Sequence, residues 1–208
     1  MIKFPKNFYP GKFIVFEGLD GSGQTTQATL LKDFLEKKGK KVFLTKEPTK
    51  NSPFAKKIKK VLEKKEKISP FKLQKLFALD RAWHLEKKII PALKKGKIVI
   101  SDRYFFSSFA YGASEGLSLK NLIKLNQKFL FPDLTLILKV SPKKCLQRIK
   151  KRGEKITLFE KEKKLEKVWS VYQKFPKMFE KVKIVDGEEK IEKVFQKVKK
   201  EVKKIISL

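Results

Sequence analysis

Five short apolar runs separated by longer amphipathic segments constrain the fold of this chain more than any other feature. The runs are rich in β-branched or aromatic residues and cover residues 13–16, 42–44, 98–100, 134–140 and 182–185. Apolar runs that alternate with helix-length segments are typical of a parallel sheet whose strands are joined by crossover helices. Their near-continuous apolar character suits strands buried on both faces. The sequence therefore predicts an α/β, three-layer fold: a five-stranded parallel sheet with helices on both faces.

Helix boundaries can also be predicted from the sequence. Ser followed by Pro is a good helix start, because Ser caps the helix and Pro fits its first position. This signal occurs at residues 69–70, before a long segment that reaches residue 93, and again at residues 141–142, before a segment that reaches residue 151. Gly96 and Gly153 are suitable stops. Without internal repeats, a linker or a break in composition, we expect residues 1–208 to form a single domain.

A glycine-rich segment follows the first apolar run and opens a helical pattern. In such a loop the backbone N–H groups surround phosphate oxygens, the helix N-terminus adds partial positive charge, and a Thr hydroxyl can reach Mg²⁺. The spacing is that of a phosphate-binding P-loop, with Gln where the pattern requires Lys. Nucleotide chemistry is the first hypothesis, and the predicted ATP-binding residues of this loop are Gly18, Leu19, Asp20, Gly21, Ser22, Gly23, Gln24, Thr25 and Thr26.

The missing lysine stands in a chain with a formal net charge of +30 and 52 Lys and Arg residues, of which only four are arginines. Such a charge raises the alternative of a surface for nucleic acid or an anionic membrane. However, the lysines are spread as Lys-Lys and Glu-Lys pairs along amphipathic stretches, which favours solvated helix faces instead. No apolar run approaches the roughly 20 residues of a bilayer span, and no secretory leader is recognisable, so we expect a cytoplasmic protein without membrane contact.

Two arginine-containing segments carry further candidates. Asp102 and Arg103 follow the third apolar run, at the strand end where parallel sheets bind ligands, so the Asp is a candidate for the magnesium shell and the Arg for phosphate. Arg148 and Arg152 end a predicted helix before Gly153, where an Arg on a closing loop could neutralise phosphate charge. In a chain so rich in lysine, arginine marks positions where a planar, bidentate cation is needed.

One predicted helix places an aromatic ring and polar groups on a common face. Phe77, Arg81 and His84 are spaced at i, i+4 and i+7. The ring could stack on a base and the guanidinium could hydrogen-bond the edge of that base. His84 is better interpreted as a packing or hydrogen-bonding residue than as a catalyst.

Four motifs together resemble the thymidylate kinases, which phosphorylate dTMP with ATP. They are Phe-Glu-Gly-Leu-Asp-Gly-Ser-Gly from residue 16, Thr-Lys-Glu-Pro from residue 45, Phe-Ala-Leu-Asp-Arg-Ala-Trp-His from residue 77, and Ser-Asp-Arg-Tyr-Phe-Phe-Ser-Ser-Phe-Ala-Tyr from residue 101. The resemblance covers nearly the whole chain. It implies a P-loop kinase with Mg²⁺, a homodimer, substrates ATP and dTMP, and a small lid segment at about residues 148–160.

The resemblance also implies roles for individual residues. Asp20 would hold the deoxyribose 3′-hydroxyl, Ser108 would read the base, and Tyr111 would pack on the sugar. Arg103, Arg152 and Gln24 are the implied catalytic residues, with Arg152 closing from the lid, and Arg148 would bind ATP. Thr25 and Asp102 would serve the metal. The implied substrate-binding set is Asp20, Glu47, Pro48, Lys59, Phe77, Arg81, Arg103, Ser108 and Tyr111.

Several positions depart from the family pattern. Lys46 and Lys59 stand where arginines are usual, and Gln24 supplies a neutral amide instead of a cation. Gly21 lacks the Arg that some members carry there, which assigns the catalytic Arg to the lid. Two alternatives therefore stay open. One is a kinase for another deoxynucleoside monophosphate, with specificity altered at Ser108 and Gly112; the other is a non-catalytic binder of nucleotide or nucleic acid.

Overall fold

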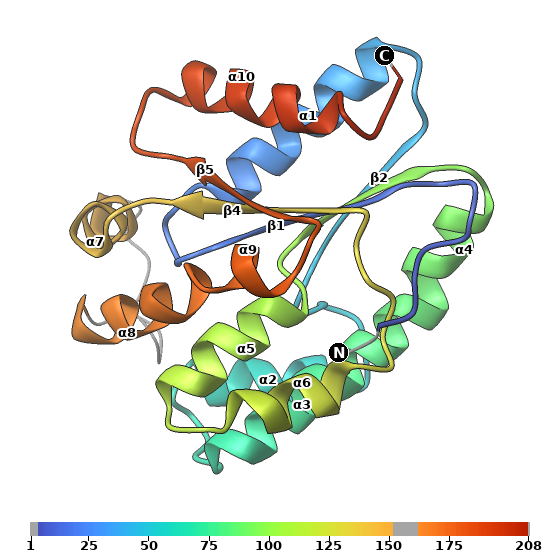
Figure 1. Cartoon of the computed structure of the whole chain (residues 1–208). Coiled ribbons are helices and arrows are strands. Elements are labelled where there is room, and N and C mark those ends of the chain that lie inside the picture. The colour runs from blue at the N-terminus through green and yellow to red at the C-terminus, as the bar shows by residue number, and fades with distance from the viewer. Residues whose placement is uncertain (1–3, 152–161, 208) are drawn as a thin grey trace.

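The structure, a computed structural model, describes residues 4–151 and 162–207 of the chain. Within these residues five strands form one parallel sheet in the order β2-β3-β1-β4-β5 (Figure 1). The strands are β1 Phe13–Gly18, β2 Val42–Lys46, β3 Ile98–Asp102, β4 Leu134–Lys139 and β5 Val182–Asp186. The helices are α1 Gln24–Lys37, α2 Ala55–Leu62, α3 Pro70–His84, α4 Ile90–Lys94, α5 Phe105–Ser114, α6 Leu119–Asn126, α7 Pro142–Lys151, α8 Glu162–Tyr172, α9 Phe175–Met178 and α10 Ile191–Val202. The predicted α/β fold and its five strands are confirmed.

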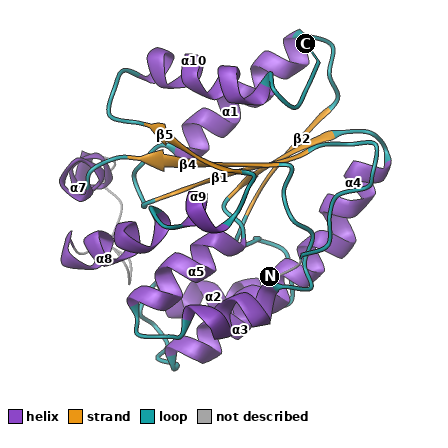
Figure 2. Cartoon of the chain, in the orientation of Figure 1, coloured by secondary structure: helices purple, strands orange, loops and turns teal. Residues whose placement is uncertain are grey.

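Helices cover both faces of the sheet (Figure 2). Successive strand side chains point to opposite faces, so β1 contributes Ile14 and Phe16 to a core shared with α1 and α10. Phe13 and Val15 belong to the second, larger core on the other face, together with aromatic residues of α5 and α9. The three-layer arrangement therefore follows from one apolar strand that fills two cores.

Burial on both faces holds for the central strands and fails at the sheet edges. Every residue of β1 and β3 is buried, whereas β2 is only half-buried. In β5, Val182 and Val185 are buried, while Lys183 and Ile184 are exposed. The reason is topological, because β2 and β5 are the outer strands and each has a neighbour on one side only.

The long helical segment begins as predicted and is then interrupted. The Ser69 hydroxyl accepts a hydrogen bond from the backbone N–H of Lys72, which caps α3. A π-helical turn at Leu85–Ile89 separates α3 from α4. Pro91 lies in the first turn of α4 and cannot donate a backbone hydrogen bond. The missing donor locally widens the helix, as proline interruptions commonly do.

The sheet brings three functional segments together at the carboxyl ends of its strands. Gly18 ends β1, Lys46 ends β2 and Asp102 ends β3. Lys46 lies opposite Asp102 in the register between β2 and β3. Because the glycine-rich loop starts at the end of β1, the phosphate-binding loop and the Asp102–Arg103 segment become neighbours, as the sequence predicts.

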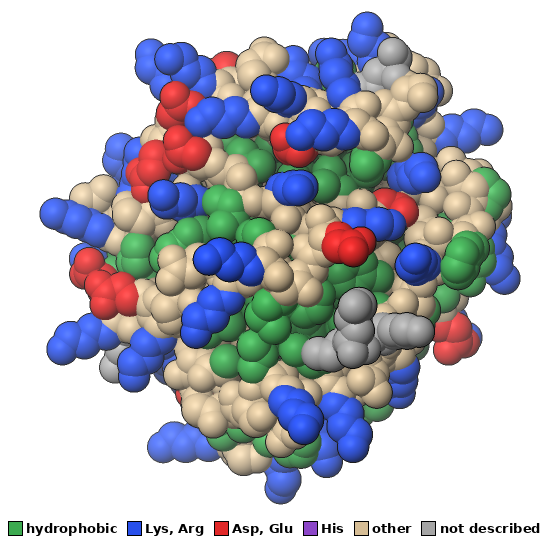
Figure 3. Space-filling view, in the orientation of Figure 1, with side chains coloured by type: hydrophobic (Ala, Val, Ile, Leu, Met, Phe, Trp, Pro, Cys, Tyr) green, Lys and Arg blue, Asp and Glu red, His purple; other side chains and the backbone are tan. Residues whose placement is uncertain are grey.

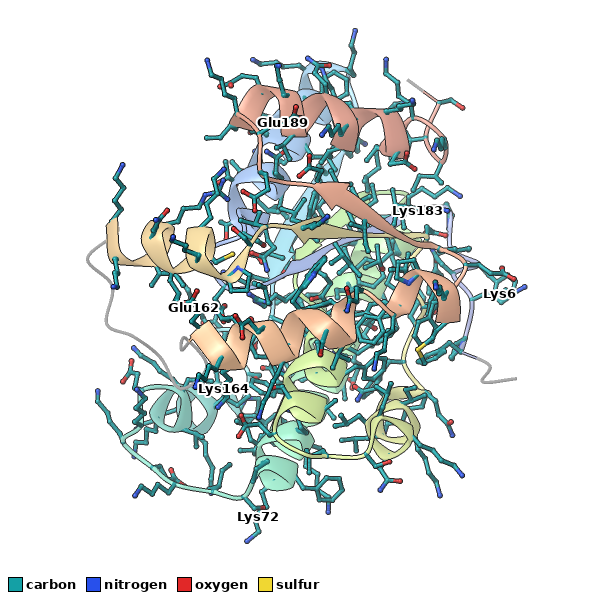
Figure 4. The ribbon with its side chains drawn as sticks, turned by 60° about the vertical axis from the view of Figure 1, so that its left-hand side comes forward. Lys6, Lys72, Glu162, Lys164, Lys183 and Glu189 are labelled. Carbon is teal, nitrogen blue, oxygen red and sulfur yellow. The ribbon has the colours of Figure 1, made fainter. Side chains whose placement is uncertain are left out.

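The positive charge on the face shown in Figure 3 is spread and not gathered. On the face shown in Figure 3, Lys and Arg side chains are scattered over helices and sheet ends, with fewer acidic groups among them. Lys6, Lys72 and Lys183 are all exposed and come from three separate segments (Figure 4). None of the helices formed by the described residues has the length and apolar character needed to cross a membrane.

Candidate functional site

The loop between β1 and α1 has the geometry of an anion cradle. Leu19 buries its side chain in the larger core, and its carbonyl accepts a bond of 3.0 Å from the backbone N–H of Ser22. Gly21 and Gly23 have φ values of 82° and 100°, in the left-handed region that favours glycine. The loop then enters α1 at Gln24, so backbone N–H groups and a helix N-terminus face the same space.

Gly21 is required by close packing as well as by its backbone angle. A Cβ atom at this position would lie 2.6 Å from the backbone oxygen of Cys145 in α7. No side chain fits there without moving α7. The absence of an Arg at this position is therefore built into the packing of the loop.

A Gly21→Ala substitution tests this packing. It should lower the free energy of unfolding by about 1 to 2 kcal/mol through backbone strain and by a further 1 to 3 kcal/mol, roughly, through overpacking against α7. Gly39 is the matched control, because its φ is 74° and a Cβ there meets nothing within 4 Å. Equal losses for Gly21→Ala and Gly39→Ala in urea unfolding would show that the contact with Cys145 is unimportant.

The Gln24 side chain is tied to its own loop. Its Nε2 donates a hydrogen bond of 2.9 Å to the carbonyl oxygen of Gly18, and the residue is buried. Gln24 lines neither of the cavities described below. The amide therefore closes the loop through its bond to Gly18.

Arg103 is held by several partners at the end of β3. Its Nη1 donates to the Gly18 carbonyl at 3.0 Å and to Ser107 Oγ at 2.9 Å, and its Nη2 donates to Asp20 Oδ1 at 2.7 Å. The guanidinium also lies over the Tyr111 ring. Burial by itself lowers the pKa of Arg103, but the nearby Asp20 carboxylate raises it well above its usual value, so the residue stays charged. With a φ of 76°, Arg103 also holds a backbone conformation that costs energy.

Oxygen donors suited to a hard cation meet beside the loop. The Thr25 hydroxyl donates to Asp102 Oδ2 at 2.5 Å, and Lys46 Nζ donates to the same carboxylate oxygen at 2.8 Å. Lys46 Nζ is also 3.4 Å from Thr25 Oγ1. A hydroxyl and a carboxylate at the edge of a phosphate loop are typical magnesium ligands, so the predicted pair fits that ion.

A cavity of about 210 Å³ opens next to Arg103. Its lining comes from the ends of β1, β2 and β3 and from α2, α3 and α5, and consists of Asp20, Lys46, Glu47, Pro48, Leu62, Gln74, Phe77, Arg81, Arg103, Tyr104, Ser107, Ser108 and Tyr111. Apart from Lys59, every residue of the predicted substrate-binding set is present. The Lys59 side chain is 76% exposed on α2, its Nζ lies 3.8 Å from Glu63 Oε1, and it does not line this cavity.

Arg81 is fixed at the inner end of this cavity by a buried network. Its Nε and Nη2 each lie 2.8 Å from Glu47 Oε2, and its Nη1 donates to Asn126 at 2.5 Å. Its Nη2 also contacts the Ser108 hydroxyl at 3.4 Å. Glu47 in turn contacts His84 Nδ1 at 3.1 Å, which supports the structural interpretation of that histidine. The guanidinium is therefore oriented before any ligand arrives.

Behind Arg103 lies the fully buried carboxylate of Glu17. It accepts hydrogen bonds from the backbone N–H groups of Tyr104 and Ser107 and from the hydroxyls of Ser107 and Tyr172. Burial raises the pKa of Glu17 to about 7, opposed by the charge of Arg103 and by these hydrogen bonds. Because Ser107 Oγ also accepts from Arg103, Glu17 and the guanidinium share one hydroxyl.

A second cavity of about 430 Å³ lies on the other side of the loop. It is lined by Gly21, Ser22, Gly23, Thr26, Gln27, Arg148, Lys151, Gly187, Glu189, Lys190, Ile191 and Val194. Arg148 Nη1 lies 3.4 Å from the carbonyl oxygens of Gly21 and Ser22, which places this arginine against the phosphate loop. Arg152 and most of the predicted lid at residues 148–160 lie outside the described residues.

Some residues of the site carry roles that the sequence interpretation did not assign. The sequence does mark Glu17, because an acidic residue inside an apolar strand needs hydrogen-bond partners. Gln74 is buried with an unpartnered Oε1 and lines the first cavity; its position three residues before Phe77 and seven before Arg81 could have placed it on the same helix face. Asn126 and Tyr172 reach the site from distant segments, so no local pattern could have indicated them.

Gly112, a candidate for altered specificity, has a packing role. A Cβ there would lie 2.8 Å from a methyl carbon of Leu122 in α6. Gly112 is absent from the lining of both cavities. Its small size lets α5 approach α6 closely.

Comparison with known proteins gives a consistent result. The sequence model described as thymidylate kinase matches residues 16–198 of this chain. A probable thymidylate kinase of Pyrococcus horikoshii is 47% identical over 162 residues, covering 76% of this chain and 78% of that relative. A probable thymidylate kinase of Thermococcus gammatolerans is 46% identical over 165 residues, covering 76% and 78%. A thymidylate kinase of Desulfotalea psychrophila is 38% identical over 164 residues, covering 78% and 81%.

Proposed function

This chain belongs to the thymidylate kinase family, and on that premise we propose that it transfers the γ-phosphoryl group of ATP to dTMP, giving ADP and dTDP for dTTP synthesis. The observation that carries the proposal is the position of the Arg103 cavity beside the phosphate loop. The loop and Arg103 are joined at the Gly18 carbonyl, which accepts hydrogen bonds from Gln24 and Arg103. A donor phosphate in the loop and an acceptor phosphate at Arg103 would therefore be neighbours.

The acceptor nucleotide is assigned to the cavity of about 210 Å³. Phe77 would stack on thymine, and Arg81 and Ser108 would bond the edge of the base. Asp20 would hold the 3′-hydroxyl and Tyr111 would pack on the sugar. The Tyr111 hydroxyl already donates a hydrogen bond of 2.8 Å to Asp20 Oδ2, so the two side chains lie side by side. Glu47 and Pro48 would complete the wall, with Glu47 fixing Arg81. Lys59 keeps a substrate role only if α2 moves inward.

Phosphoryl transfer needs positioning and charge neutralisation more than proton removal. An oxygen of the dTMP phosphate forms the new bond to the γ-phosphorus, and the bridging oxygen of ADP takes the electron pair of the bond that breaks. Because the acceptor oxygen is already anionic, no side chain has to act as a strong base. Arg103 would orient the acceptor phosphate, Arg148 would contact ATP, and Arg152 would close from the lid.

We propose Mg²⁺ as the cofactor, held by Thr25 and Asp102. When bound, it would offset the negative charge of the ATP phosphates. Gln24 would stabilise the shape of the loop through its bond to Gly18. We further propose a single-domain, cytoplasmic protein that forms a homodimer, as the family resemblance implies for its assembly. Sedimentation at micromolar concentration tests the dimer.

A substrate panel tests the proposed reaction. Turnover with ATP is measured for dTMP, dUMP, dGMP and AMP, with and without Mg²⁺, and dTMP should have the highest kcat/KM. A preference for dGMP or AMP would establish the alternative of a kinase for another monophosphate. Nucleotide binding without dTDP formation would establish the non-catalytic alternative, which family membership does not favour.

A Phe77→Ala substitution should raise KM for dTMP about tenfold, because stacking of a base on an aromatic ring contributes roughly 1 to 3 kcal/mol. The KM for ATP should stay within twofold. Phe71→Ala is the matched control on the same helix, since the Phe71 ring is exposed and lies outside the cavity. Equal values of KM for the two variants would contradict the stacking role.

A further inference from the structure

Lys46 occupies the meeting point of the phosphate loop, β3 and the acceptor cavity. It is the last residue of β2 and lies opposite Asp102 in the sheet register. Its ammonium group is 2.8 Å from Asp102 Oδ2 and 3.4 Å from Thr25 Oγ1. It also lines the cavity that contains Arg103. A single positive charge is therefore placed between the donor and acceptor sides of the site.

The phosphate loop supplies no side-chain cation of its own. From Gly18 through the first two turns of α1 the sequence has no Lys or Arg, and the first one is Lys32. The Gln24 amide is occupied by the Gly18 carbonyl at 2.9 Å. Backbone N–H groups can cradle phosphate, but a full positive charge has to come from another element.

Arg81 and Arg103, which line the same cavity as Lys46, are restrained by their contacts. Arg103 divides its two terminal nitrogens among Gly18, Ser107 and Asp20. Lys46 has a half-exposed side chain (55%) beyond its contact with Asp102, so its end can turn. A lysine ammonium is a compact charge on a flexible stem, which suits a group that must follow a moving phosphoryl group.

We propose that Lys46 is a catalytic residue that replaces the missing loop lysine and neutralises the phosphoryl group during transfer. This proposal rests on the proposed kinase function. As the acceptor oxygen bonds to the γ-phosphorus and the bridging oxygen leaves with its electron pair, the Lys46 ammonium would bond an oxygen of the transferring group. It stays protonated throughout, so no proton has to be supplied or removed.

The test is a rescue series of Lys46→Met, Gln24→Lys and the double variant. Lys46→Met should lower kcat about 10² to 10³-fold, the usual loss for one preorganised transition-state donor, with KM for dTMP within threefold of the parent. The double variant should regain at least tenfold of that loss, because Gln24→Lys restores a cation to the loop. Lys139→Met is the matched control, since Lys139 is the exposed last residue of β4 and lines neither cavity.

Binding of ADP with aluminium fluoride, Mg²⁺ and dTMP gives a readout that needs no turnover. This mixture mimics the transferring phosphoryl group, so Lys46→Met should weaken its binding at least tenfold and Gln24→Lys should restore it. A parent chain that binds the mimic without forming dTDP would contradict the proposed function, and the affinity series would still decide the role of Lys46. The proposal would be overturned if Lys46→Met bound the mimic with an affinity within threefold of the parent. It would also be overturned if the double variant bound the mimic as weakly as Lys46→Met.

Discussion

An Arg103→Lys variant is expected to lose about 10² to 10³-fold in turnover although its charge is unchanged. The guanidinium reaches the Gly18 carbonyl, the Ser107 hydroxyl and the Asp20 carboxylate at once. A lysine ammonium cannot reproduce that planar fork. Steady-state rates with ATP and dTMP give the loss.

The substitution leaves the backbone strain unchanged, because Arg and Lys meet the same steric cost at a φ of 76°. The lost hydrogen bonds should still lower the unfolding temperature of the variant, so rates are compared below that temperature, where both proteins are folded. Turnover within threefold of the parent would show that charge alone suffices at this position. It would also remove the reason for assigning the acceptor phosphate to Arg103.

The second large effect concerns Glu17 and pH. Burial raises the pKa of Glu17 to about 7 from its ordinary value of 4.5. Between those pH values the unfolded chain releases this proton while the folded chain keeps it, so stability falls as pH rises. The contribution of Glu17 to that fall is about 3 kcal/mol. Glu17→Gln removes the titrating group, so its free energy of unfolding relative to the parent should rise by about this amount across the interval.

Urea unfolding of both proteins at pH 4.5 and pH 7.5 measures this difference. Tyr172→Phe gives an independent check, because it deletes a hydrogen bond that favours the Glu17 carboxylate. The pKa of Glu17 should then rise further and the loss of stability should extend to higher pH. A difference between Glu17→Gln and the parent that is equal at both pH values would contradict the assignment.

The sequence predicted the sheet because each strand pattern is local. Apolar runs and Ser-Pro helix starts depend on neighbouring residues, so the five strands and the starts of α3 and α7 were found. The lower burial of the edge strands was not predicted, since the exposure of β5 depends on which strand lies beside it. The interruption of the helix before α4 could have been suspected from Pro91.

In the site, spacing predicted where side chains start but not where they point. Asp20, Phe77 and Tyr111 line one cavity, because the elements that carry them fix their positions. Gln24 turns back to Gly18, and Lys46 reaches across to Asp102. The first direction results from a hydrogen bond within the loop and the second from a hydrogen bond between neighbouring strands, and the spacing of the motifs encodes neither.

The placement of the arginines gives the site a built-in spectroscopic label. The chain has four arginines, and Arg81, Arg103 and Arg148 all contact the cavities, while Arg152 lies outside the described residues. In a protein labelled with ¹⁵N-arginine, three of the four guanidinium signals would thus arise from the two cavities, two from that of about 210 Å³ and one from that of about 430 Å³. A titration with either nucleotide would then be followed at separate resonances, because the lysines carry no ¹⁵N label.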